Sequence, residues 1–180
     1  IFDEIDFVRP DVAYVMQRAL EGNGLVVTED GGRVVTPHPM FRIFATGNTV
    51  GQGDEHGMYQ GARPQSMAML DRFNVWVQVE YMSNEQRAKL IDSKVPGMSV
   101  ENLDNLNRYI EEHITAFTNA KVMQPVTPRG YVAMAEAMQM FTSVMGDDDR
   151  AFRSAIEMTV LDRATQEDRA VLDGILQRFH

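Results

Sequence analysis

The stretch of sequence that says most about the fold is Phe41-Arg42-Ile43-Phe44-Ala45-Thr46-Gly47-Asn48. Its apolar residues, followed by small ones, predict a core strand over 41–46 that ends in a turn. Asn48 then stands at the carboxyl end of that strand, where an amide can orient a water or a phosphate oxygen. Asparagine is also a common turn residue, so the sequence leaves both interpretations of Asn48 open.

A second strand end lies at the start of the chain, where Asp3-Glu4 follows the apolar pair Ile1-Phe2. At the tip of a parallel strand, Asp3 can hold Mg²⁺ through water and Glu4 can polarise an attacking water. Two acids in a row are also common where a solvated loop begins, and this alternative stays open. The chain starts inside an apolar segment without a methionine, which predicts that it is a segment of a longer protein.

The remainder of the first 80 residues predicts a mixed α/β region. Apolar residues at helical spacing follow Pro10, at positions 12, 15, 16, 19 and 20, and two glycines end the pattern. The segments 25–28 and 33–35 are the arms of a predicted hairpin around Glu29-Asp30-Gly31-Gly32. A glycine-rich loop over 47–64, a short helix over 66–73 and a strand over 75–79 complete this half.

The sequence after residue 80 predicts only helices. Ser83 and Gln86 form a capping box, and Thr127-Pro128 and Thr165 are further helix starts. Apolar residues recur at helical spacing in each segment between these starts. The shift in pattern divides the chain into two predicted domains, 1–80 and 81–180.

Two arginines stand at helix ends. Arg72, in Leu70-Asp71-Arg72-Phe73, can project across a subunit interface and stabilise phosphoryl charge, or it can pair within the chain with Asp71 or another acid. Arg129 lies in the first turn of a helix, where positive charge opposes the helix dipole. Such local inconsistencies are expected at functional sites, although a single surface arginine is also ordinary.

Composition excludes several functions. The chain of 180 residues has 17 Lys+Arg and 26 Asp+Glu, a net charge of −9, which disfavours non-specific binding to nucleic acid or an anionic membrane. It has no cysteine, and therefore no disulfide, thiol nucleophile or thiolate metal site. No apolar run approaches the roughly 18 residues of a membrane span. The histidines show no metal-ligand spacing and are expected to be structural or exposed: His38, His56, His113 and His180.

The order of these features resembles the second half of an AAA+ ATPase module. The resemblance assigns Asp3-Glu4 to the Walker B motif, Asn48 to sensor 1, Arg72 to the arginine finger and Arg129 to sensor 2. It also implies that the hairpin over 25–35 is the pre-sensor-1 hairpin of the branch that contains the MoxR-type ATPases and the chelatase motors. The fold implied is a partial AAA+ α/β core with a parallel sheet, followed by an all-α lid.

Within that branch the chain resembles the CobS subunits of cobaltochelatases. The stretch 37–51 is similar to their sensor segment. It consists of Pro37-His38-Pro39-Met40, the predicted strand over 41–46, Gly47 and then Asn48-Thr49-Val50-Gly51. Gly53-Asp54, Gly57-Met58-Tyr59, Met69-Leu70-Asp71-Arg72-Phe73 and the stretches Arg9-Pro10-Asp11-Val12 and Thr127-Pro128-Arg129 continue the similarity. Phe73 departs from the tryptophan common after the finger arginine in this family.

The resemblance implies a cytoplasmic, Mg²⁺-dependent ATPase that assembles as a homo-oligomeric ring. In such an enzyme, ATP hydrolysis drives cobalt insertion into a corrin-ring precursor in cobalamin biosynthesis. The implied partners are a large tetrapyrrole-binding subunit and a subunit with an adhesion-type domain, with no nucleic acid and no membrane. Two alternatives remain: a MoxR-type remodelling chaperone, and a non-catalytic interaction module of AAA+ shape.

One expected feature is missing from these residues. The chain has no G-x-x-x-x-G-K-[ST] sequence, the loop that cradles phosphates in these ATPases. The resemblance therefore predicts that this loop lies upstream of Ile1. The 180 residues are expected to bind nucleotide poorly by themselves and to be inactive alone.

Overall fold

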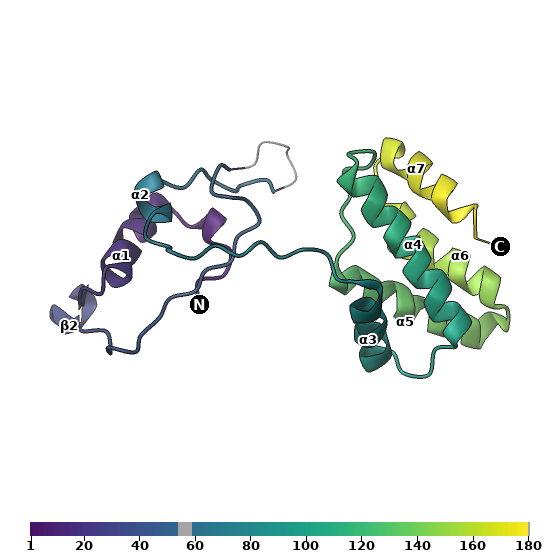
Figure 1. Cartoon of the computed structure of the whole chain (residues 1–180), viewed down its shortest axis with the longest axis horizontal. Helices are drawn as coiled ribbons and strands as arrows, with labels where there is room; N and C mark the ends of the chain where they lie inside the picture. The colour runs from purple at the N-terminus through teal and green to yellow at the C-terminus, as the bar shows by residue number, and fades with distance from the viewer. Residues whose placement is uncertain (54–58, 180) are drawn as a thin grey trace. The chain divides into compact units, whose positions relative to one another are not determined.

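The computed structural model describes residues 1–53 and 59–179. The chain divides into two compact units, Ile1–Val79 and Glu80–His180 (Figure 1). Each unit has its own apolar core, and neither core includes residues of the other unit. The assignment of the two units to a nucleotide-binding core and a lid stays a prediction.

The first unit is built from short elements joined by long irregular segments. Its elements are η1 (Ile5–Phe7), α1 (Pro10–Leu20), β1 (Leu25–Val27), η2 (Thr28–Asp30), β2 (Arg33–Val35) and α2 (Met67–Leu70). Its core consists of Ile5, Met16 and Met69, which bring the start of the chain, α1 and α2 together.

Helix α1 begins and ends as the sequence predicts, with Pro10 in its first turn. Its buried face differs from the predicted stripe. Ala13, Met16 and Ala19 are buried, whereas Val12 and Val15 are 49% and 55% exposed. The small core of this unit covers only one side of the helix, so the two valines find no apolar neighbour to bury them.

The predicted hairpin is confirmed. β1 pairs antiparallel with β2 in the register Leu25↔Val35, Val26↔Val34 and Val27↔Arg33. Gly31 and Gly32 both have positive φ, the backbone conformation that glycine adopts at least cost and that closes the turn.

The predicted strands over 41–46 and 75–79 do not form, and the expected parallel sheet is reduced to one bridge in the part of the chain that the structure describes. That bridge joins Phe2 and Ala45 in parallel. An extended segment becomes a strand only when a neighbour satisfies its N–H and C=O groups. The segment 75–79 has no described partner, and Val77 and Val79 are 80% and 90% exposed.

The described residues of the second unit form helices and their connections, with no strand among them, as predicted. It contains α3 (Asn84–Lys94), α4 (Val100–Thr118), α5 (Pro128–Met145), α6 (Asp148–Thr159), η3 (Leu161–Arg163) and α7 (Gln166–Leu176). The capping box of Ser83 and Gln86 is present, and the side chains of Thr127 and Thr165 cap α5 and α7. The predicted helix starts are therefore confirmed.

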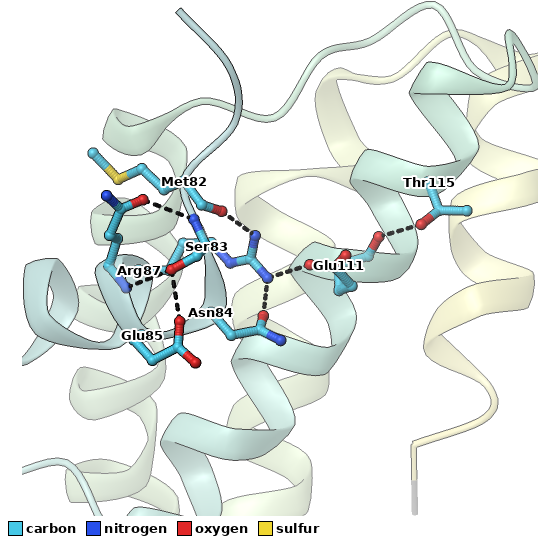
Figure 2. A network of polar contacts seen from close by, with 8 residues as sticks. Met82, Ser83, Asn84, Glu85, Arg87, Glu111 and Thr115 are labelled. Atoms are coloured by element: carbon cyan, nitrogen blue, oxygen red, sulfur yellow. Dashed lines mark hydrogen bonds and ion pairs between the residues drawn. The ribbon is translucent and has the colours of Figure 1, made fainter.

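A buried arginine fixes the entry of the chain into this unit (Figure 2). Arg87, 1% exposed, donates from Nη1 to the carbonyl oxygen of Met82 at 2.7 Å. Its Nη2 contacts Asn84 and forms an ion pair with Glu111 of α4. One guanidinium thus ties the residues before α3 to α3 and to α4.

A buried carboxylate fixes the connection that leads into α5. Asp168, in the first turn of α7, accepts hydrogen bonds from the backbone N–H groups of Met123 and Gln124, each at 2.9 Å. The carbonyl oxygen of Gln124 lies 2.9 Å from Nε2 of the fully buried His113. These bonds fix the segment that leads to Thr127. They therefore also fix the start of α5, where the exposed Arg129 lies.

Candidate active site

The parallel bridge brings the two predicted strand ends together. The N–H of Phe2 donates to the carbonyl oxygen of Phe44 at 2.8 Å, and the N–H of Thr46 donates back to the carbonyl oxygen of Phe2 at 2.9 Å. The N–H of Ile5 donates to the carbonyl oxygen of Thr46 at 2.8 Å. Because these bonds flank Asp3 and Glu4, both carboxylates lie next to the end of the 41–48 stretch.

Thr46 holds the acidic pair through its side chain. Its hydroxyl donates to Oδ1 of Asp3. The hydroxyl oxygen Oγ1 of Thr46 also accepts from the N–H of Glu4 at 3.1 Å. Asp3 and Glu4 are both exposed, so their free oxygens face solvent. Sequence reasoning did not single out Thr46. Its hydroxyl at the tip of the predicted strand was the available signal.

Glu4 has a backbone conformation that side chains rarely adopt. Its φ and ψ are 55° and 52°, in the left-handed region. Among described residues other than glycine, only Ala120 also has positive φ. Strained backbone of this kind persists where neighbouring contacts enforce it, and it is frequent at active sites. Here the enforcing contacts are the bonds of Glu4 and Ile5 to Thr46.

Asp6 organises the loop that carries Asn48. This carboxylate, 1% exposed, accepts from the N–H of Asn48, and from the N–H and hydroxyl of Thr49 at 3.1 and 2.9 Å. A Cβ added to Gly47 would lie 2.9 Å from Oδ2 of Asp6, so only glycine lets the loop wrap this closely. Asn48 itself is exposed. Asp6 was not predicted, because nothing in its local sequence shows which distant backbone it caps.

Arg72 follows the C-terminal end of α2, two residues after Leu70. It pairs within the chain with Glu21, which follows α1, and not with Asp71. Its Nε donates to Oε1 of Glu21 at 2.9 Å, its Nη2 contacts the same oxygen, and its Nη1 donates to the carbonyl oxygen of Ala68.

Arg129 is exposed in the first turn of α5 and makes no hydrogen bond or ion pair with any described residue. Thr127 accepts from the N–H of Gly130 at 3.3 Å and so fixes the helix start beneath it. In the first unit, Asp3 and Glu4 are bonded to Thr46, two residues before Asn48. Arg129 belongs to the second unit.

The donor set around Asp3 suits a water-bridged magnesium ion. Over residues 1–53 and 59–179 no group of three or more His, Asp or Glu side chains is placed to hold a metal. Magnesium in nucleotide sites needs only one or two carboxylates, with waters and phosphate oxygens as its other ligands. Asp3 has one oxygen bonded to Thr46 and one left for such a water.

The histidines match their predicted structural or exposed roles where the structure describes them. His113 is buried in the second unit and His38 is exposed in the first. His56 and His180 lie outside the described residues, as do Asp54, Gly57 and Met58 of the sequence resemblance. No described helix is long and apolar enough to cross a membrane.

A comparison with curated proteins finds the aerobic cobaltochelatase subunit CobS of Sinorhizobium sp. at 34% identity over 99% of this chain. The chain is similar to CobS. The match confirms the resemblance drawn from the sensor segment and extends it through the helical unit. The chain spans about half of that relative, 52% of its length. No family model matches the chain.

Proposed function

We propose that this chain carries the catalytic edge and the lid of an ATP-hydrolysing AAA+ motor related to CobS. The observation that supports the proposal best is the pairing of Asp3-Glu4 with Thr46, next to the loop of Asn48. To this edge we assign a carboxylate for magnesium (Asp3), a carboxylate for water (Glu4) and an amide (Asn48).

Each residue then has a separate role. Asp3 binds Mg²⁺ through water and Glu4 polarises the water that attacks the γ-phosphate. Asn48 orients that water or a phosphate oxygen. Arg72 acts on the nucleotide of the neighbouring subunit as an arginine finger, and Arg129 contacts the nucleotide from the lid as sensor 2. ATP is bound mainly by a phosphate loop outside these 180 residues.

The proposed client follows from the similarity to CobS. ATP hydrolysis by a homo-oligomeric ring drives insertion of cobalt, the substrate metal, into a corrin-ring precursor in the cytoplasm. The ring works with a large tetrapyrrole-binding subunit and an adhesion-type domain subunit. The 34% identity to a chelatase subunit favours this client over that of a MoxR-type chaperone. The presence of Glu4 favours a motor over a non-catalytic module.

The test is the substitution Glu4→Gln in the complete gene product. Removing the group that activates water should lower kcat for ATP by two to four orders of magnitude, while ATP still binds. The variant should therefore retain unhydrolysed ATP after rapid gel filtration. Glu136→Gln, an exposed glutamate on α5, is the matched control and should turn over like the wild type. Wild-type turnover by Glu4→Gln would refute the Walker B assignment.

A further inference from the structure

Glu21 and Arg72 form a contact that the assignment of the arginine finger does not require. They are 51 positions apart in the sequence and lie at the ends of α1 and α2. The Arg72 side chain is 27% exposed and the Glu21 side chain 43% exposed. Both belong to the first unit, so the contact is made within one compact body.

The contact with Glu21 occupies one edge of the Arg72 guanidinium and leaves other N–H donors without a partner among the described residues. Arginine has five N–H donors: one on Nε and two on each Nη. Glu21 takes one from Nε and one from Nη2 through Oε1, and the carbonyl of Ala68 takes one from Nη1. One donor on Nη1 and one on Nη2 remain. These two donors, on neighbouring nitrogens, are available to bind phosphate oxygens.

Hydrogen bonds fix the carboxylate of Glu21, although its position at a helix end is unfavourable for a negative charge. Its second oxygen, Oε2, accepts from Nδ2 of Asn23 at 3.2 Å, so both carboxylate oxygens are fixed. It stands at the C-terminal end of α1, where the helix dipole disfavours a negative charge. A carboxylate kept at an unfavourable helix end indicates a function in what it contacts. The hydrogen bond from Arg72 accordingly holds the pKa of Glu21 below its ordinary value.

We propose that Glu21 is the positioning residue of the arginine finger: it clamps the inner edge of the Arg72 guanidinium and presents the remaining Nη1 and Nη2 donors to the γ-phosphate in the neighbouring subunit. This inference rests on the proposed role of Arg72. A long, free arginine side chain would lose rotamer entropy when it met the transition state. Because Glu21 and Ala68 already order the Arg72 side chain, this entropy is not lost again in the transition state, as in other preorganised catalytic groups.

The experiment is a double-mutant cycle on ATP hydrolysis by the complete gene product. Arg72→Ala should lower kcat about 10³-fold, the lower range for loss of an arginine finger. Glu21→Ala should lower kcat about 10- to 100-fold, the effect of a displaced but present catalytic group, with KM for ATP unchanged. Glu21→Gln keeps an acceptor oxygen at the same place and should recover most of that loss. Glu21→Ala combined with Arg72→Ala should be no slower than Arg72→Ala alone.

The matched control is Asp71→Ala, which removes an exposed acid beside Arg72 that forms no ion pair among the described residues. It should turn over at the wild-type rate. In mixed assemblies, Glu21→Ala subunits and Glu4→Gln subunits should recover activity above either variant alone, because some interfaces then contain both intact groups. A merely structural effect of Glu21 would lower the melting temperature and would not be complemented.

The outcomes separate this inference from the proposed function. If Arg72→Ala retains wild-type turnover, the arginine-finger assignment fails, and the role of Glu21 fails with it. If Arg72→Ala is inactive while Glu21→Ala keeps the wild-type rate, only the positioning role is refuted. A rate above wild type for Glu21→Ala would also refute the positioning role, because Glu21 would then keep Arg72 away from the nucleotide. An additive loss in the double variant would show that the two residues act independently.

Discussion

His113 is the residue whose environment makes the clearest prediction about pH. It is fully buried, its Nε2–H donates to the carbonyl oxygen of Gln124, and its Nδ1 has no partner among the described residues. Burial lowers the pKa of His113 below 6.5, the effect of Arg163 has the same sign, and the Gln124 carbonyl and Asp168 oppose it. The ring of Tyr109 packs edge-on against it and carries no charge near neutral pH.

The sign follows from proton binding. Below pH 6.5 the unfolded chain takes up a proton at this site that the folded chain refuses, so acidification destabilises the fold. We expect the free energy of unfolding to fall by up to about 1.4 kcal/mol per pH unit between pH 6.5 and the lowered pKa of His113. Urea unfolding at pH 7.5 and 5.5 measures this. His113→Asn should lose less stability over that interval. Equal losses in both proteins would contradict the prediction.

The residues proposed to act on nucleotide and water could be singled out from the sequence, and those that position them could not. Asp3, Glu4 and Asn48 follow apolar stretches, a local pattern visible in the sequence. Thr46 and Asp6 act across about 40 positions, through backbone pairing that only the fold reveals. Glu21 was hidden for the same reason, since its partner Arg72 lies 51 positions away.

At the scale of elements, helices were predicted better than strands because a helix satisfies its own backbone. Ser83, Thr127 and Thr165 each cap a helix through bonds to residues three positions away, which sequence shows directly. A strand needs a partner, and the alternation over 75–79 says nothing about whether one is present. The hairpin over 25–35 succeeded because its turn supplies the partner locally.

The element contact that most invites a test is the ion pair between α3 and α4. Glu111→Ala removes the charged partner of Arg87, whose side chain is 2% exposed, and leaves a buried charge with only Met82 and Asn84 to bind it. We expect a loss of about 1–3 kcal/mol in the free energy of unfolding. Urea denaturation measures it, with Glu136→Ala on α5 as a control that should change stability by less than about 0.5 kcal/mol. Equal effects of both variants would show that the pair contributes nothing.

At the scale of the whole molecule, apolar burial is distributed unevenly. The core of the second unit runs from Ile91 to Phe179 and draws on all five of its described α-helices. The core cluster of the first unit has only Ile5, Met16 and Met69 as buried members, and the other buried apolar residues described in this unit are Ala13, Ala19 and Leu70. Large side chains of that unit stay exposed, among them Trp76 at 58% and Phe44 at 66%. Since apolar burial is the main stabilising contribution to folding, the second unit must be the more stable.

We therefore expect residues 1–180 to unfold in two steps, with the helical unit melting last. A protein of residues 80–180 should fold alone and melt at the temperature of the second step, because its core uses no residue of the first unit. Millimolar Mg-ATP should raise the melting temperature of neither step by more than about two degrees, since a ligand stabilises only the state that binds it and the phosphate loop is not in this sequence.

Scanning calorimetry of both proteins, with and without nucleotide, measures the two melting temperatures and the effect of nucleotide on them. A shift of many degrees in residues 1–180 would place a complete phosphate site within them, and failure of residues 80–180 to fold would show that the helical unit depends on the first.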